Sequence, residues 1–92
     1  MAKAQAPDIG TIFGGVLRQF RASAGISQEE LADRAGVDRT FISRLERGIR
    51  QPTITTLLSL GKALGVSAAD LVGQTEIELS GPTDRKPRKK QN

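Results

Sequence analysis

Apolar residues recur along residues 9–73 at the spacing of short amphipathic helices. The first group falls at positions i, i+3, i+4 and i+7, on one face of a helix: Phe13, Val16, Leu17 and Phe20. Gly25 follows this group and suits a left-handed C-terminal cap. Residues 1–8 lack the pattern and are expected to form a flexible N-terminus. The pattern therefore predicts a first helix that ends at Gly25.

Four further helices are indicated by capping residues at their starts and by glycines at their ends. The predicted start signals are Ser27 with Glu30, Asp38, Pro52-Thr53, and Ser67 with Asp70. The glycines that close these four helices are Gly36, Gly48, Gly65 and Gly73. The sequence thus predicts an all-α, compact domain of five helices over residues 9–73.

The pattern changes after Gly73, where residues 74–92 are expected to form a C-terminal arm and a basic tail. Within it, residues 76–79 alternate polar and apolar side chains, which predicts a short strand or an extended arm. Residues 82–92 are polar, basic and contain proline, a composition typical of disorder. We interpret this flexible basic tail as a solubilising end, a non-specific DNA clamp or an extension added to the natural chain.

Composition excludes several classes of function. The chain contains no cysteine and no histidine, so disulfides, thiolate chemistry and imidazole-based metal or acid–base sites are absent. No apolar run approaches the ~20 residues of a membrane span, and residues 1–7 do not form a signal peptide. We therefore expect a cytoplasmic protein that is not an enzyme and that needs no metal, cofactor or membrane.

The charge of the chain is unevenly distributed, although its net value is only +4. Up to Thr83 the basic and acidic residues balance, so the excess lies in the last nine residues. Inside the domain, residues 27–38 carry a net charge of −3, whereas residues 39–50 carry four arginines against Glu46, for +3. A basic segment inside a neutral domain indicates a local binding surface for a polyanion.

Residues 28–47 have the spacing of two helices joined by a tight turn. Ala32 is small enough to let the second helix approach, and Gly36 permits the positive φ that a turn of three or four residues needs. Burial of Val37, Ile42 and Leu45 would leave an outer face made of Arg39, Thr40, Ser43, Arg44 and Arg47. An ordinary helical hairpin with a solvated basic face is the alternative interpretation.

These stretches resemble the Xre family, the helix-turn-helix class of phage repressors and Cro-like regulators. The matching residues are Gly14-x-x-Leu17-Arg18-x-x-Arg21, Gly25 to Ala32, Ile42 to Gly48, Pro52-Thr53, Leu64 to Ser67 and Asp70-Leu71. The run from Asp38 to Ser43 is also similar to the controller proteins of restriction–modification systems. The resemblance covers about residues 12–73 and implies a repressor-like, DNA-binding helix-turn-helix domain in a bacterial or phage protein associated with the nucleoid.

The resemblance also implies roles for individual residues. Four would contact bases in the major groove: Arg39, Thr40, Ser43 and Arg44. Three would contact phosphates: Gln28, Arg47 and Arg50. Arginine can bind guanine through two parallel hydrogen bonds, worth about 1–3 kcal/mol of discrimination. Arg21 and Glu46 hold positions that form a partly buried salt bridge in relatives, and we favour this structural role over a catalytic one.

We expect the partner to be double-stranded DNA bound by a homodimer, because one helix reads too few base pairs for useful specificity. The predicted function is that of a transcriptional regulator on a two-fold symmetric operator. Apolar residues in and around the fifth helix are the candidates for the dimer interface: Val66, Leu71, Val72, Ile77 and Leu79. The alternative is an antitoxin or another protein-interaction module in which residues 74–92 fold on a partner.

Overall fold

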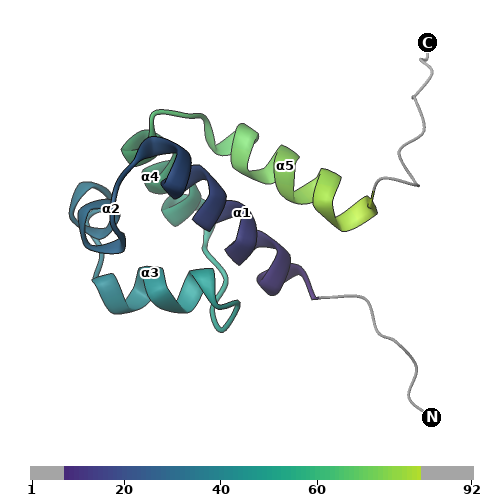
Figure 1. The fold of residues 1–92 in the computed structure, drawn as a ribbon, viewed down its shortest axis with the longest axis horizontal. Helices are drawn as coiled ribbons and strands as arrows, with labels where there is room; N and C mark the ends of the chain where they lie inside the picture. Colours follow the sequence, from purple (N-terminus) through teal and green to yellow (C-terminus); the bar gives the residue numbers. More distant parts are fainter. Residues whose placement is uncertain (1–7, 82–92) are drawn as a thin grey trace.

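The computed structural model describes residues 8–81, which form five helices and no strand (Figure 1). The helices are α1 (Ile9–Ala24), α2 (Gln28–Ala35), α3 (Arg39–Glu46), α4 (Ile54–Leu64) and α5 (Ala68–Ser80). The predicted all-α class is therefore confirmed. The predicted disorder of residues 82–92 lies outside the described residues, as does most of the predicted N-terminal lead-in. Within residues 8–81, no single helix is long and apolar enough to cross a membrane; α4 and α5 meet that length and composition only as a pair bent by 104°.

All five helices contribute to one apolar core. Six large side chains are completely buried in it: Leu17, Leu31, Ile42, Leu45, Leu60 and Leu71. The helices α1 and α5 lie side by side in Figure 1 and contact each other, while α2 packs against both α3 and α4. The core thus holds α3 at the edge of the molecule with one face toward solvent.

The helix boundaries agree with most of the predicted capping residues. Ser27 Oγ accepts a hydrogen bond from the Glu30 amide at 3.0 Å, and Ser67 with Asp70 forms a complete capping box. Asp38 is the N-cap of α3 but its side chain makes no capping hydrogen bond. Asp8, predicted to be part of the flexible lead-in, caps α1 through the Thr11 amide.

The helix α5 is longer than predicted. It passes through Gly73 and continues to Ser80, so both the predicted end at Gly73 and the strand or extended arm at residues 76–79 are wrong. Thr75 is buried and donates a hydrogen bond to the Leu71 carbonyl oxygen at 2.7 Å. Packing against α1 offsets the ~1 kcal/mol that a glycine inside a helix costs relative to alanine. The predicted domain boundary at residue 73 therefore falls inside a helix.

Gly14 allows α1 to approach the end of α3. A Cβ atom at this position would lie 2.5 Å from the backbone oxygen of Glu46 and 2.6 Å from that of Leu45. Both neighbours are backbone atoms of a packed helix, so neither can move without shifting α3. The neighbouring Gly15 has open space around the position of its Cβ.

We expect Gly14→Ala to lower the free energy of unfolding by about 1–3 kcal/mol, because overpacking outweighs the gain in helix propensity. Gly15→Ala is the matched control and should raise the free energy of unfolding by up to ~1 kcal/mol. Urea unfolding followed by circular dichroism measures both. Equal changes in the two variants would contradict the close approach of α1 and α3.

Candidate nucleic-acid interface

A turn of three residues joins α2 to α3. Gly36 adopts φ 73°, and the Val37 amide donates to the Ala32 carbonyl oxygen at 2.9 Å, which closes the end of α2. Ala32 is 3% exposed and Ile42 is completely buried, so the two helices pack tightly and pin the inner face of α3. The tight helical pair predicted from the spacing of residues 28–47 is present.

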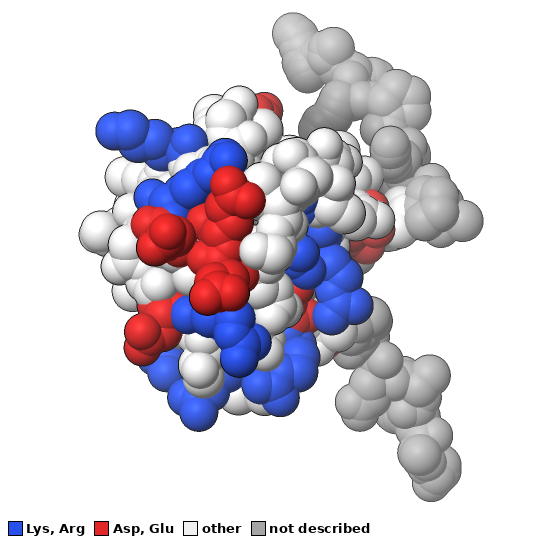
Figure 2. Space-filling model, turned by 60° about the vertical axis from the view of Figure 1, so that its left-hand side comes forward, with Lys and Arg blue, Asp and Glu red and all other residues white. Residues whose placement is uncertain are grey.

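The outer face of α3 is basic and open to solvent. Arg39, Thr40 and Arg44 are exposed, and Ser43 is half-buried. Lys and Arg side chains gather along the lower edge of the molecule, where α3 lies, whereas Asp and Glu side chains cover the region of α2 above it (Figure 2). The structure thus brings the four predicted base-contacting residues to one surface.

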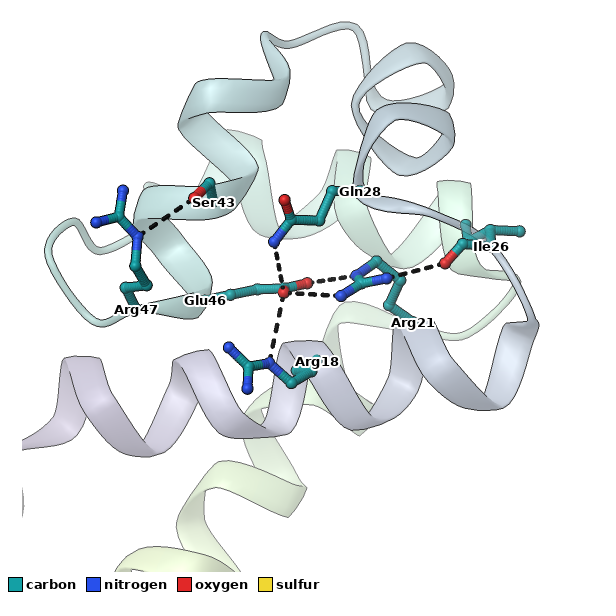
Figure 3. A network of polar contacts seen from close by, with 7 residues as sticks. All are labelled: Arg18, Arg21, Ile26, Gln28, Ser43, Glu46 and Arg47. Atoms are coloured by element: carbon teal, nitrogen blue, oxygen red, sulfur yellow. Dashed lines mark hydrogen bonds and ion pairs between the residues drawn. The ribbon is translucent and has the colours of Figure 1, made fainter.

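The two predicted phosphate-contacting arginines border this face. Arg47, at the end of α3, is exposed, and its Nε donates a hydrogen bond to Ser43 Oγ at 3.3 Å (Figure 3). Arg50 lies in the loop after α3, with its guanidinium 5.7 Å from the centroid of the Phe41 ring, within cation–π range. Both cations are therefore held beside α3, with their charge still at the surface.

A buried carboxylate connects α3 to α1. The Glu46 side chain is completely buried, and Arg21 donates from Nε to Oε2 at 2.6 Å and from Nη2 to Oε1 at 3.0 Å (Figure 3). Arg21 Nη1 also donates to the Ile26 carbonyl oxygen at 3.0 Å. The predicted pair is thus a two-bonded ion pair that fastens α3 to α1 and to the segment before α2.

The ionisation of this pair follows from its surroundings. Burial by itself raises the pKa of Glu46, but hydrogen bonds from Arg21 and Gln28 and the charges of Arg21 and Arg18 outweigh it, so the pKa lies below the ordinary value. The hydrogen bond to Glu46 raises the pKa of Arg21. Both groups are therefore charged at neutral pH.

Gln28 is the first residue of α2, as predicted, and its side chain also contacts Glu46. It is half-buried, and its Nε2 donates to Glu46 Oε1 at 3.0 Å. A carboxamide nitrogen carries two hydrogens, and this bond uses one of them. A phosphate contact by the second hydrogen of Gln28 stays a prediction.

Arg18, for which the sequence predicts no role, lies beside the same carboxylate. Its Nε lies 3.6 Å from Glu46 Oε1, and its side chain is 59% exposed. The available signal was its position one helical turn before Arg21, on the same side of α1.

The five apolar residues predicted to form a dimer interface differ in how far they are buried. Leu71 is completely buried in the core, so its assignment to the interface is wrong. Val66 is half-buried and packs against the core. Val72 and Leu79 are about half exposed on one side of α5, whereas Ile77 lies roughly 150° around the helix from them.

Two exposed apolar residues of α4 were missed. Ile54 is 71% exposed and Leu58 is 60% exposed, one helical turn apart. Leu57, between them in sequence, lines a hollow of about 140 Å³ together with Ile9 and Val72. We call Ile9, Ile54, Leu57, Leu58 and Val72 the apolar patch. The sequence does not distinguish Ile54 and Leu58 from core residues, because only the fold shows which side of α4 is covered.

A helix, a tight turn and a second helix with an outward basic face define a helix-turn-helix DNA-binding domain. The helix-turn-helix family matches residues 17–71, and the chain belongs to this family. The resemblance to Xre regulators is thereby confirmed.

Relatives of similar length support the same identification. An uncharacterized helix-turn-helix transcriptional regulator, y4dJ of Sinorhizobium fredii, is 39% identical over 80 residues, which cover 87% of this chain and 94% of that protein. The control protein C.BamHI of Bacillus amyloliquefaciens is 41% identical over 71 residues, or 76% of this chain and 88% of that one.

Solved structures of helix-turn-helix regulators also resemble this chain. The clp gene regulator ClgR of Corynebacterium glutamicum matches with a TM-score of 0.75 and 36% identity, covering 80% of this chain and 95% of that chain. The restriction–modification controller protein C.AhdI of Aeromonas hydrophila matches with a TM-score of 0.66 and 37% identity, covering 67% and 90%. The protein is a DNA-binding transcriptional regulator of the helix-turn-helix type.

Proposed function

We propose that the protein binds a two-fold symmetric operator in double-stranded DNA as a homodimer, with α3 in the major groove. The observation that carries this proposal is the exposed outer face of α3, with Arg39, Thr40 and Arg44 at the surface and Ser43 beside them. The major groove admits one helix, and arginine and threonine suit its guanine acceptors and thymine methyl groups. Arg47 and Arg50 would bind phosphates and fix the register.

The distribution of charge supports α3 as the helix closest to DNA. The helix α2 carries three exposed carboxylates, Glu29, Glu30 and Asp33. Only one cation accompanies them within α2, Arg34, whose Nη2 lies 2.8 Å from Glu30 Oε2. Phosphates repel such a surface, so α2 would stay above the groove while α3 enters it.

We propose the apolar patch as the dimer interface. Single exposed apolar residues are common, but Ile9, Leu57 and Val72 come from three helices and line one hollow, while Ile54 and Leu58 are exposed on the same helix as Leu57. Apolar residues gathered in this way are typical of an interaction surface. A two-fold dimer would place two copies of α3 about 34–36 Å apart, one turn of DNA. An antitoxin-type module receives less support, because residues 74–80 already belong to α5.

We expect Arg44→Ala to relax base preference at one or two positions of each half-site, with a loss of about 1–3 kcal/mol on the preferred sequence. Fluorescence anisotropy against an operator and its single-base variants measures this. Arg34→Ala, which removes an exposed arginine of α2, is the control and should leave base preference unchanged. A uniform loss of affinity for all sequences in Arg44→Ala would show that Arg44 contacts phosphate and not bases.

A further inference from the structure

We propose that Arg18 is a further phosphate ligand, held beside Gln28 by the buried carboxylate of Glu46. This inference rests on the proposed binding of double-stranded DNA and adds a contact from α1. The ligand is the phosphodiester anion of the DNA backbone next to the groove that α3 enters.

The positive and negative charges around Glu46 do not balance. The single negative charge of Glu46 faces two guanidinium groups, Arg21 and Arg18. Arg21 donates hydrogen bonds to both carboxylate oxygens of Glu46, and its side chain is only 18% exposed. The charges of Arg21 and Glu46 therefore compensate each other. The uncompensated positive charge is therefore that of Arg18, whose side chain is 59% exposed.

Hydrogen-bond donors of Arg18 and Gln28 lie close together beside Glu46. Arg18 Nε lies 3.6 Å and Gln28 Nε2 lies 3.0 Å from the same atom, Glu46 Oε1, although the two residues belong to different helices. Each retains N–H groups that Glu46 does not use. In Figure 3 the terminal nitrogens of Arg18 point away from Glu46, toward the side of the network where Ser43 and Arg47 lie. The free N–H groups of these two neighbouring side chains can donate to phosphate oxygens, and the positive charge of Arg18 strengthens such a bond.

Arg18, Gln28 and Glu46 lie next to the surface proposed to bind DNA. Glu46 is the last residue of α3 and Gln28 is the first residue of α2, so this cluster adjoins the end of the exposed basic face. The contact between Arg18 and Glu46 is longer than a hydrogen bond and largely solvated, so it stabilises the fold by no more than about 1 kcal/mol. Arg18 can therefore bind an anion without disturbing the core.

The test measures the salt dependence of binding to a non-specific duplex and to an operator selected with the wild-type chain. In Arg18→Ala, the slope of log affinity against log salt should become shallower by about 1, which reduces the affinity lost between 50 and 200 mM salt about three- to four-fold. Affinity should fall by a similar factor on all sequences. The melting temperature should stay within a few degrees of wild type.

Two further variants complete the design. Arg34→Ala removes the same charge from α2 and should keep the wild-type slope, and Arg18→Lys should keep it because the cation remains. Arg18→Gln, which keeps a polar side chain, replaces Arg18→Ala if the alanine variant melts early. An unchanged slope in a folded Arg18 variant would overturn the inference. If the wild-type chain bound DNA without sequence preference, the proposed function would be overturned. The inference about Arg18 would still be tested, because the salt dependence of affinity is also measured on a non-specific duplex.

Discussion

Replacing Arg21 by alanine should lower the free energy of unfolding by about 3–5 kcal/mol, because it leaves the buried carboxylate of Glu46 without its main partner. Glu46 is completely buried, and Arg21 supplies two of its hydrogen bonds. Domains of this size are stable by only about 5–10 kcal/mol, so the variant should be close to unfolding at 37 °C. Urea unfolding followed by circular dichroism measures the loss.

The control replaces both partners. Arg21→Met with Glu46→Leu removes the pair without leaving a buried charge, and should recover most of the stability lost in Arg21→Ala. An Arg21→Ala variant within 1 kcal/mol of wild type would mean that water reaches Glu46.

The same pair makes stability depend on pH. Because the pKa of Glu46 is lowered in the folded chain, the stabilisation is complete above the ordinary glutamate pKa of about 4.3. It is lost as the pH falls below that value and through the lower pKa of the folded state. Unfolding of wild type should therefore become easier below pH 4, and Glu46→Gln should show a weaker dependence on pH in that range.

Leu58→Glu should convert the proposed homodimer to a monomer and weaken operator binding about 100-fold or more. A carboxylate in the apolar patch would have to be buried on association. Dimerisation makes the second half-site contact intramolecular, a gain of about 10²–10⁴ in affinity that the monomer loses. Sedimentation at micromolar concentration and anisotropy on a full operator measure the two effects.

Ile77→Glu provides the matched control. Ile77 is 49% exposed, comparable to Leu58 at 60%, but lies on the other side of α5 from Val72. This variant should remain a dimer with wild-type affinity. If Leu58→Glu stayed dimeric, the interface would lie elsewhere on the molecule.

Local signals in the sequence predict most of the fold. Ser27, Ser67 and Gly36 cap helices as expected, because capping depends on a few neighbouring residues. The end of α5 was not predictable in this way. Residues 76–79 alternate over too short a stretch to separate helix from strand, and the helix past Gly73 depends on packing against α1, which is distant in sequence.

In the candidate site, too, local features were predictable from the sequence and contacts between distant residues were not. The contrast between an acidic α2 and a basic α3 is a property of composition, so it was visible in the sequence. The bond between Gln28 and Glu46 depends on the first residue of α2 meeting the last residue of α3, which only the fold determines. The burial of Leu71 was not predictable, because the sequence does not show whether an apolar residue of a helix lies in the core or at the surface.

Selection of bound sequences from random duplex DNA with the wild-type chain tests whether a homodimer binds DNA through α3. We expect a two-fold symmetric consensus whose half-sites lie about 10–10.5 base pairs apart from centre to centre. An unenriched pool, or a consensus made of one asymmetric half-site, would contradict binding by a homodimer with α3 in successive major grooves.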